Sequence, residues 1–424
     1  MRLGSAGTTS LPDLSLIHYR PVMMSVVLVA PTIDGDDVGE ALVAHNWALL
    51  LSERVDLTIL TYRKRGFAPI REQIPRARVI EWTEPRGIGR LERFNSLFKP
   101  AYFVFYWRAR RWLMRAKARG EHFDIGHQVA PVAMRYPSPF PGTGVPFVIG
   151  PVGGSLESPP GFASEETGPW YLKLRRLDRW RLRHDPWLRR TYEQSACVVG
   201  IADYVRDTLT GVNVRRLEIM SDVGLMEVPP TTPRTPDPDP SPDRPLHVLF
   251  AGRVIRTKGV RDLVAAMALL RDLPVVADLV GDGFDMQACQ RLAAENGAQN
   301  VVFHGWKSRP EVDAFYQAAD IFVFPSYREP GGTVVFEAMG YGLPLVVCDR
   351  GGPSAAVDHA CAILVPATTP AQYAQDLAAA IRQLAGDSSQ RLAMGEASLR
   401  RLAEVGLWSR KVDRMCALYE ELLR

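Results

Sequence analysis

The sequence predicts an α/β protein of two domains, each built around a parallel sheet. Three observations lead to this prediction. The chain has 424 residues, which is more than one hydrophobic core usually organises. Short apolar runs alternate with stretches of helical periodicity, a pattern typical of βαβ units. A segment dense in proline, residues 227–245, interrupts this alternation near the middle of the chain.

The first half opens with a buried strand, a turn rich in Gly and Asp, and a helix. The apolar run at its start is too short to span a bilayer and is better interpreted as a strand than as a signal sequence. The elements expected in this half are strands at 26–30, 55–61, 125–130, 146–150 and 197–201, and a helix at 41–51.

The second half alternates more regularly between strands and helices. Its apolar runs are four to six residues long and are separated by amphipathic stretches, as in a doubly wound sheet. The expected elements are strands at 246–250, 275–280, 301–303, 321–324 and 345–347, and helices at 260–270, 286–295 and 407–423.

The proline-rich segment predicts the domain boundaries. Proline removes backbone donors and biases its neighbours toward extended conformations, so no packed element is expected at 227–245. We therefore predict a first domain at 1–226 and a second at 246–404. In such folds, ligands bind at the carboxyl ends of the strands, which here would face the cleft between the domains.

Composition narrows the class of protein. The net charge is only +4, and no nucleic-acid motif accompanies it, so nucleic acid is not an expected partner. The five cysteines are far apart and none has CxxC spacing, which favours reduced thiols in a cytoplasmic protein over a disulfide framework or a zinc site. These residues are Cys197, Cys289, Cys348, Cys361 and Cys416.

The first chemical motif is the string FAGRVIRTKGV, residues 250–260. A strand ends at a glycine, and a loop carrying Arg253 and Lys258 then leads into a helix. Unpaired N–H groups at the helix start, together with two cations, suit a diphosphate. The alternative is a solvated loop with two surface cations.

The second motif lies at residues 327–346, after a buried strand. Glu329 and Glu337 bracket a diglycine and the start of a helix, where the backbone can approach a ligand closely. The carboxylate inside the helix can accept hydrogen bonds from two neighbouring hydroxyls, as in a ribose. The carboxylate before the glycines would lie nearer a hexose. Either acid alone would be interpreted as a solvated surface group.

This second motif resembles the Glu-x7-Glu motif of the retaining GT-B glycosyltransferases, family 4 (glycosyl transferases group 1). The other segments follow in that family's order, and the resemblance is dense over residues 246–365. It implies the GT-B fold, in which two Rossmann-like domains have parallel sheets that face a central cleft. It also implies that residues 405–424 pack back on the first domain.

The resemblance implies a role for each matching residue. Arg253 and Lys258 correspond to the pair on the donor pyrophosphate, Glu337 to the ribose ligand, and Glu329 to the acid on the transferred sugar. Further contacts to the nucleotide sugar are implied for Gly252, Gly305, Trp306, Lys307, Gly331, Gly332 and Thr333.

The loop 31–40 occupies the place of the family's first glycine-rich loop, and it implies that Gly35 and Gly39 face the donor. It also carries four acids, which would repel a diphosphate. These acids either point away or address the acceptor, and Asp36 or Asp37 is also a candidate cap for the following helix. The string from Asp36 to Glu40 resembles family members involved in surface polysaccharides.

His127 follows a predicted strand and resembles the first histidine of the family's His-x-His strand end. We include it among the candidate catalytic residues. The second histidine position is Val129 here, a departure that puts the role of His127 in doubt. The alternative is a packed histidine at a strand end. The segment 148–162, with a diglycine after a strand, resembles a loop that faces the cleft.

Two basic, aromatic stretches, 98–119 and 170–190, are each expected to form helices. Trp, Tyr and Phe on one side and Arg and Lys on another are typical of helices at the surface of an anionic membrane. The alternative is a pair of amphipathic helices packed on the sheet, with solvated arginines.

These inferences predict a retaining hexosyltransferase. The expected donor is a nucleoside diphosphate sugar, a UDP-sugar more than a GDP-sugar, and the expected acceptor is a hydroxyl of a glycan or lipid-linked glycan. Surface polysaccharide or glycolipid synthesis is the expected process, in the cytoplasm or on the inner face of the cell membrane. No cofactor or metal is expected. The alternatives are a UDP-sugar epimerase of the same fold and a non-catalytic sugar-nucleotide-binding partner.

Overall fold

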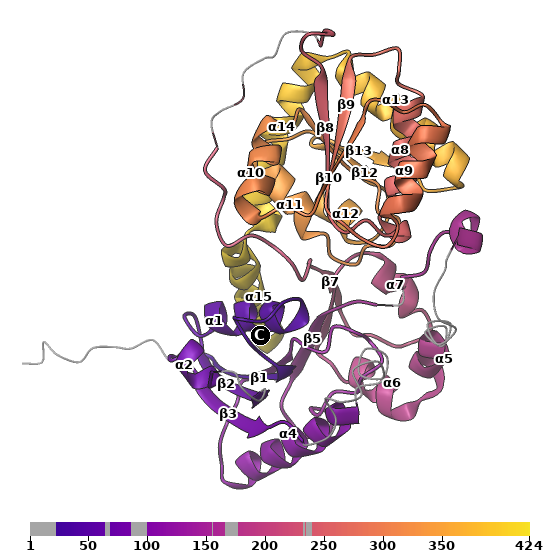
Figure 1. Cartoon of the computed structure of the whole chain (residues 1–424). Coiled ribbons are helices and arrows are strands. Elements are labelled where there is room, and N and C mark those ends of the chain that lie inside the picture. The colour runs from indigo at the N-terminus through magenta and orange to yellow at the C-terminus, as the bar shows by residue number, and fades with distance from the viewer. Residues whose placement is uncertain are drawn as a thin grey trace, which may run out of the picture.

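The computed structural model describes residues 23–63, 68–85, 100–154, 156–165, 177–231, 234 and 240–424. Two all-parallel sheets form the centres of two lobes, which Figure 1 shows one above the other. The lower lobe holds a seven-stranded sheet from the first half of the chain, and the upper lobe holds a six-stranded sheet from the second half. The predicted α/β class with two parallel sheets is confirmed.

The first sheet has the order β3-β2-β1-β4-β5-β6-β7, so the chain reverses its direction of winding between β1 and β4. Its strands are β1 (Ser25–Thr32), β2 (Asp56–Arg63), β3 (Arg78–Thr83), β4 (Ile125–Gln128), β5 (Phe147–Val152), β6 (Cys197–Gly200) and β7 (Leu217–Ile219).

The two faces of the first sheet bury different helices. Alternate residues of a strand point to opposite faces, and in β1 Val26 and Leu28 join a core cluster that contains residues of α1 (Glu40–Leu51) and α15 (Trp408–Leu423). Val27 and Val29 join a second cluster with α4 (Pro100–Ala118). The other helices described in the first half of the chain are α2 (Ile70–Gln73), η2 (Pro160–Glu165), α5 (Leu177–His184), α6 (Pro186–Glu193) and α7 (Tyr204–Thr208).

The second sheet has the order β10-β9-β8-β11-β12-β13, with its reversal between β8 and β11. Its strands are β8 (Leu246–Ala251), β9 (Val275–Val280), β10 (Val301–Gly305), β11 (Ile321–Phe324), β12 (Leu345–Cys348) and β13 (Ala362–Val365). Its helices are η4 (Arg256–Lys258), α8 (Val260–Ala268), α9 (Met286–Glu295), α10 (Arg309–Ala318), α11 (Thr333–Gly340), α12 (Gly351–Ala356), α13 (Pro370–Ala385), α14 (Ser388–Arg401) and the π-helix η5 (Leu402–Gly406).

The last helix returns from the upper lobe to the lower one (Figure 1). Trp408 and Tyr419 of α15 lie in the core cluster on the α1 face of the first sheet, and the centroids of the Trp408 and Trp47 rings, which meet edge to face, are 5.3 Å apart. The return was expected from the resemblance, and a packed apolar face explains it.

The domain boundaries at 226 and 245 stay a prediction, and the two sheets lie on either side of them. The described residues of the segment 227–245 form no helix and no named strand. Arg234 nevertheless fastens this segment to the second lobe, because its guanidinium donates to the backbone carbonyls of Tyr316, Ala319 and Tyr341.

The two basic stretches differ in structure. The first forms α4 over most of its predicted length, and residues 98–99 lie outside the described part. The second is not one helix: α5 ends at His184, and Asp185 caps α6 by accepting from the backbone N–H groups of Trp187 and Leu188. The expected helical structure is therefore present in the described residues 177–190, as two short helices. Pro186 at the first turn of α6 has no N–H for a continuous helix.

Candidate functional site

The predicted donor-binding residues come together at one edge of the second sheet. Because all its strands are parallel, the loops that follow β8, β10 and β11 leave at the same edge. The loop after β8 carries Arg253 and Lys258, and the loop after β11 carries Glu329. These two strands are neighbours at the reversal of the sheet, which is where doubly wound folds bind ligands.

Lys258 and Glu329 form an ion pair across this edge, with both side chains 14% exposed. The Glu329 carboxylate also accepts from the backbone N–H of Gly331 at 3.4 Å. Burial and the neighbouring Arg253 guanidinium lower the pKa of Lys258 to about 8, while the contacting Glu329 carboxylate favours the ammonium form. Lys258 is therefore still cationic at neutral pH. The side chain of Arg253 is exposed, and no ion pair holds it within the described structure.

Two glycines let the backbone make the turns at this edge. Gly259, before α8, has φ +74°, and a Cβ there would lie 2.0 Å from the carbonyl oxygen of Pro325. Gly332, before α11, has φ +93° and packs on the ring of Pro353. Both positions need the left-handed conformation that only glycine adopts at little cost. Thr333 is the exposed first residue of α11.

Glu337 lies on α11 with both carboxylate oxygens engaged. Its Oε1 pairs with Nη1 of Arg309 at 2.5 Å, and its Oε2 accepts from the hydroxyl of Tyr316 at 3.0 Å. Each carboxylate oxygen has a second lone pair, so the acid can accept further hydrogen bonds from a diol. The side chain is 14% exposed and reachable.

Arg309 and Tyr316 were not among the predicted site residues. Both belong to α10, which follows the predicted loop 305–307. An arginine at a helix start and a tyrosine inside it are common, and Arg309 is 28 positions from Glu337 in the sequence. No local pattern links them, and only the packing of α10 against α11 brings them together.

The loop after β10 carries the residues predicted near the nucleotide base. Gly305 has φ +68°, and Trp306 is 76% exposed. Lys307 lies 3.5 Å from the carboxylate of Glu311. Gly252 follows β8, and its N–H donates to the carbonyl of Val280. The exposed indole offers a free stacking surface at this edge.

Most of the acids in the loop after β1 of the first lobe accept hydrogen bonds from other protein groups. Asp34 is buried and accepts from the amide of Gln73 and the N–H of Asp36. Glu40 accepts from the N–H of Val132 at 2.6 Å. These two acids therefore point into the protein, one of the two arrangements expected. No side chain caps α1, whose N-cap is Gly39, so capping by Asp36 or Asp37 was wrong.

The two glycines of this loop differ in their surroundings. Gly35 donates to the side chain of Gln73 and lies against the ring of His45, about 3 Å from where its Cβ would be. Gly39 has φ +67° and open space around its Cβ position. Contact of Gly35 and Gly39 with the donor stays a prediction.

His127 lies in the core of the first lobe and has no exposed surface. Its Nε2–H donates to the carbonyl of Gly150 at 2.6 Å, and its Nδ1 accepts from the hydroxyl of Tyr419 at 2.5 Å. Burial lowers the pKa of His127 to about 4, so the ring is neutral. Both nitrogens are used in joining β4, β5 and α15. The catalytic role stays a prediction, and this geometry favours the alternative of a packed histidine.

A further acid lies beside the diglycine although no motif includes it. The Oδ1 atom of Asp222 is buried without a hydrogen-bond partner and lies 3.4 Å from the position of a Cβ on Gly331. Burial raises the pKa of Asp222 to about 6. Burial likewise lowers the pKa of Lys411, on α15, to about 7. Both belong to the crossing segments between the lobes, whose proximity the sequence does not show.

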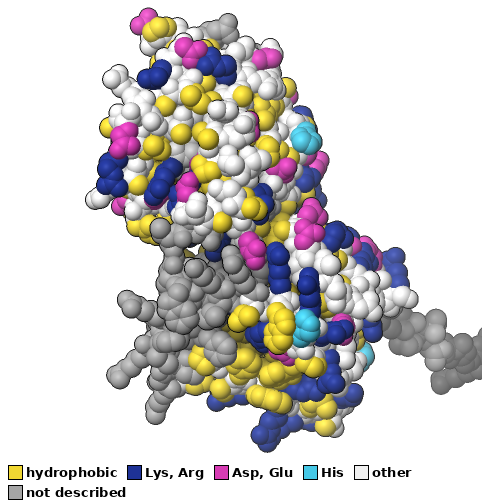
Figure 2. Space-filling model, turned by 90° about the vertical axis from the view of Figure 1, so that its right-hand side faces the viewer, with side chains coloured by type: hydrophobic (Ala, Val, Ile, Leu, Met, Phe, Trp, Pro, Cys, Tyr) yellow, Lys and Arg dark blue, Asp and Glu magenta, His cyan; other side chains and the backbone are white. Residues whose placement is uncertain are grey.

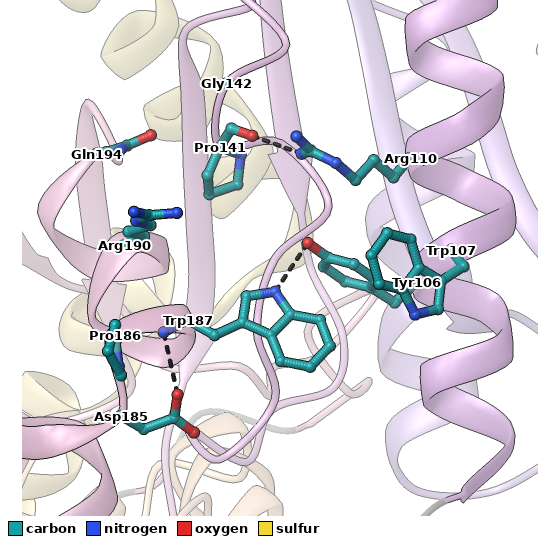
Figure 3. A pocket seen from close by; sticks show the side chains of 10 residues that line it. All are labelled: Tyr106, Trp107, Arg110, Pro141, Gly142, Asp185, Pro186, Trp187, Arg190 and Gln194. Atoms are coloured by element: carbon teal, nitrogen blue, oxygen red, sulfur yellow. Dashed lines mark hydrogen bonds between the residues drawn. The ribbon is translucent and has the colours of Figure 1, made fainter.

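A pocket of about 600 Å³ lies elsewhere, between α4 and α6 in the first lobe (Figure 3). Tyr106 accepts a hydrogen bond from the indole of Trp187, and Arg110 donates to the carbonyl of Pro141. The lining residues are Tyr106, Trp107, Arg110, Pro141, Gly142, Asp185, Pro186, Trp187, Arg190 and Gln194. This pocket lies in the other lobe from the residues Arg253, Lys258, Glu329 and Glu337 and is a separate feature.

The fold is shared with solved structures over almost the whole chain. Sucrose-phosphate synthase from Thermosynechococcus elongatus superposes with a TM-score of 0.62 at 20% identity, over 94% of this chain and 99% of that one. The Anabaena protein Alr3699/HepE in complex with UDP gives a TM-score of 0.58 at 17% identity, over 94% and 100%. The architecture is the GT-B fold, as the resemblance implied.

The sequence match covers the second half of the chain. Residues 232–401 match the family described as Glycosyl transferases group 1, and this stretch includes every residue of the second lobe that was predicted to bind the donor. The D-inositol 3-phosphate glycosyltransferase of Pseudarthrobacter chlorophenolicus is 36% identical over 174 residues, which are 39% of this chain and 40% of that protein. The chain therefore spans about two-fifths of the length of this curated relative.

Proposed function

We propose that this protein is a retaining glycosyltransferase of family 4 that moves a hexosyl group from a nucleoside diphosphate sugar to a hydroxyl acceptor. The observation that carries the proposal is the convergence of two cations and two acids at the reversal of the second sheet. The UDP bound by the similarly folded Anabaena protein makes a uridine donor the first to test.

The residues of this edge suit the charge that develops in such a reaction. Breaking the bond to the anomeric carbon leaves negative charge on the diphosphate. Arg253 and Lys258, with the backbone N–H groups at the start of α11, would stabilise that charge without a metal. The acceptor hydroxyl would attack on the face that the diphosphate leaves, and the departing phosphate would take its proton.

Donor binding would exchange the ion pair at the edge for contacts with the ligand. Lys258 would turn from Glu329 to the diphosphate, which frees the Glu329 carboxylate to accept from hexose hydroxyls. Glu337 would keep Arg309 and Tyr316 and use its remaining lone pairs for the ribose. Closure of the lobes would exclude water and so limit hydrolysis.

A thermal-shift panel of nucleoside diphosphates and their sugars tests the donor half. A ligand that binds the native state raises the melting temperature by mass action, and we expect UDP or a UDP-sugar to do so. Arg253→Ala should abolish the shift, and Arg291→Ala on the exposed side of α9 should leave it unchanged. No response to any nucleotide would overturn the proposal.

The acceptor half needs a product assay. A transferase yields a glycosylated acceptor, whereas an epimerase converts the UDP-sugar without one. A protein that binds the nucleotide sugar and converts nothing would be a non-catalytic partner. We propose a glycan or lipid-linked glycan of surface polysaccharide or glycolipid synthesis as the acceptor.

We also propose that the first lobe contacts an anionic membrane on its cytoplasmic side. Among the residues described, no helix is long and apolar enough to cross a bilayer. The outward face of α4 instead combines exposed Trp107 and Met114 with exposed arginines, and residues 100–119 contain no acid. Apolar groups flanked by cations suit an interface with anionic lipids. Figure 2 shows further hydrophobic and cationic side chains gathered on the side of α5 and α6.

The pocket between α4 and α6 opens on this cationic surface. Arg190 is exposed and forms no ion pair in the described structure. Trp107 is 59% exposed at the rim. A lipid phosphate beside Arg190 with acyl carbon against Trp107 fits this chemistry.

Vesicle sedimentation tests this contact. The protein should bind phosphatidylglycerol vesicles at low salt and lose binding at high salt, because surface electrostatics are screened. Trp107→Ser should weaken binding, whereas Trp306→Ser, which removes an exposed indole from the other lobe, should not. Equal binding to phosphatidylcholine vesicles, or no binding to either, would refute the membrane proposal.

A further inference from the structure

Residues 156–165 belong to the first half of the chain but pack on the second lobe. They follow β5 of the first sheet and end in the 3₁₀-helix η2. Phe162 has no exposed surface and is a member of the core cluster of the second lobe. This segment, called the bridge below, is therefore a further connection between the lobes, in addition to the linker and α15.

The Phe162 ring is seated between two tyrosines of the second lobe. Its centroid lies 4.3 Å from that of Tyr327 and 5.9 Å from that of Tyr373. The backbone beside it is equally close: a Cβ on Gly161 would lie 2.1 Å from the carbonyl oxygen of Thr368. Aromatic pairs at these distances contribute beyond the burial of their area. Tyr327 is two residues before Glu329, so this contact reaches the loop that carries the sugar-side acid.

Glu165 makes the second contact, to the other donor loop. Its carboxylate pairs with Arg256, which also pairs with Asp262 of α8. The Arg256 guanidinium lies 5.4 Å from the ring centroids of both Phe162 and Tyr327. Arg256 stands between Arg253 and Lys258 in the sequence and is buried. The bridge therefore contacts the buried arginine of the loop predicted to bind the diphosphate.

The start of the bridge touches a third loop of the same edge. Arg350 donates to the carbonyl of Glu157 at 2.9 Å, and a Cβ on Gly351 would lie 3.0 Å from Leu156. Gly352, next in the chain, donates to the carbonyl of Glu329 at 2.9 Å. One segment of the first lobe thus contacts the loops after β8, β11 and β12.

We propose that the bridge, residues 156–165, acts as a tether by which the first lobe positions the donor-binding loops of the second lobe. Phe162 and Glu165 are its positioning residues. The inference rests on the proposed function for the identity of the ligand. The tether does not touch the donor. It acts through Arg256 and Tyr327, so that a movement of the first lobe is transmitted to the loops of Lys258 and Glu329.

Glu165→Gln tests the tether, with Glu157→Gln as its matched control. Glu157 is an exposed acid of the same segment, and its contact with Arg350 uses the backbone carbonyl, which the substitution keeps. We expect Glu165→Gln to weaken UDP binding about 3- to 10-fold by calorimetry, the size expected for one charged hydrogen bond acting indirectly. Hydrogen exchange of residues 252–260 in the free protein should become faster. Glu157→Gln removes the same charge and should change neither the UDP affinity nor the hydrogen exchange of residues 252–260.

Phe162→Leu separates positioning from stability. Leucine keeps the site apolar and loses the contact with the Tyr327 ring. We expect faster exchange over residues 326–334 and a raised Kd for UDP at a temperature well below unfolding. A lower melting temperature with unchanged exchange and unchanged Kd in both variants would reduce Phe162 to a core residue and overturn the tether. Tighter UDP binding by Glu165→Gln would also overturn the tether, because it would mean that the Glu165 carboxylate only repels the diphosphate.

The measurements distinguish a failure of the proposed function from a failure of the tether. If the wild-type protein binds no nucleotide, the proposed function fails, and the exchange data alone decide the tether. If it binds UDP and the two variants match Glu157→Gln in both measurements, the tether fails and the proposed function stands.

Discussion

In two acids of the second lobe, the neighbouring side chains determine how a carboxylate can bind a ligand. Glu329 pairs with Lys258 and Glu337 with Arg309, so in the free protein each carboxylate is already balanced by a cation. Both side chains are 14% exposed and remain reachable from the edge of the sheet. A ligand must therefore either displace a cation or share the acid with it.

Glu337→Gln gives a prediction for the nucleotide side. The amide keeps the size of the side chain and loses the charge, so the hydrogen bonds to a ribose diol weaken in the ground state and the transition state alike. We expect KM for the donor to rise about tenfold with kcat little changed. Steady-state kinetics with Glu295→Gln, an exposed acid at the end of α9, as the control should separate this effect from general loss of charge. An unchanged KM would contradict the ribose assignment.

His127 gives a prediction for pH. Its pKa is about 4 in the folded protein and about 6.5 when unfolded. Between these values the unfolded chain takes up a proton that the folded chain refuses. The stability due to the neutral ring is complete above pH 6.5 and is lost as pH falls toward 4, by about 3 kcal/mol.

Urea unfolding between pH 4.5 and 7 checks this sign. His127→Gln can still donate to Gly150 and accept from Tyr419, so it should retain most stability at pH 7 and lose less of it toward pH 4.5. His122→Gln changes an exposed imidazole and should keep the wild-type slope. Part of the slope will persist in both, because burial also lowers the pKa of His45. A wild-type slope in His127→Gln would be the contrary result.

At the scale of elements, single residues set where helices begin. The basic stretch 170–190 forms two helices within its described part because Asp185 caps α6 and Pro186 follows it. In the loop after β8, η4 passes into α8 through Gly259, which takes the left-handed conformation. Start signals of this kind are visible in the sequence, but an amphipathic pattern can hide them.

Gly259→Ala tests the turn between η4 and α8. A side chain at positive φ costs about 1–2 kcal/mol, and the approach of the Cβ to Pro325 adds to it. We expect a loss of stability of at least that size and weaker binding of the donor. Gly386→Ala is the control: Gly386 has φ −85° and its nearest neighbour would be 3.7 Å away. Equal denaturation midpoints for the two variants would show that the turn tolerates a side chain.

At the scale of the whole molecule, each lobe contains a segment from the other half of the chain in its core. Residues from α15 complete the core of the first lobe, and Phe162 enters the core of the second. Leu225 and Leu407 pair where the chain crosses between the lobes in both directions. Stability of one lobe therefore depends on residues that are distant in the chain.

Trp408→Ala tests this dependence. Trp408 is 2% exposed and packs on Trp47, so its removal should cost about 3–5 kcal/mol. The loss should appear in the first lobe, as faster hydrogen exchange of β1 and α1, although the residue follows the second sheet in sequence. Trp306→Ala, at an exposed position, should leave stability unchanged. Destabilisation confined to the second lobe would be inconsistent with this account.

The sequence by itself determined the α/β class, most strands and the meeting of the Arg253, Lys258 and Glu329 loops at one edge of the second sheet. Strand β9 and helix α9 have the predicted bounds, because apolar periodicity is a local property of the chain. The strands β3, β7 and β13 were missed. The residues of β3 and β7 are only partly buried, and a half-buried strand at a sheet edge has a weak apolar pattern.

Only the tertiary structure decided which distant residues meet. The partners of Glu337, the engagement of both His127 nitrogens and the insertion of Phe162 depend on contacts between segments tens to hundreds of positions apart. Such contacts follow from the packing of helices on sheets, which no local pattern records. The meeting of the Arg253, Lys258 and Glu329 loops at one edge was predictable because parallel strands bring their loops to one side. The charge balance within it was not, because that balance is set by α10 and by the first lobe.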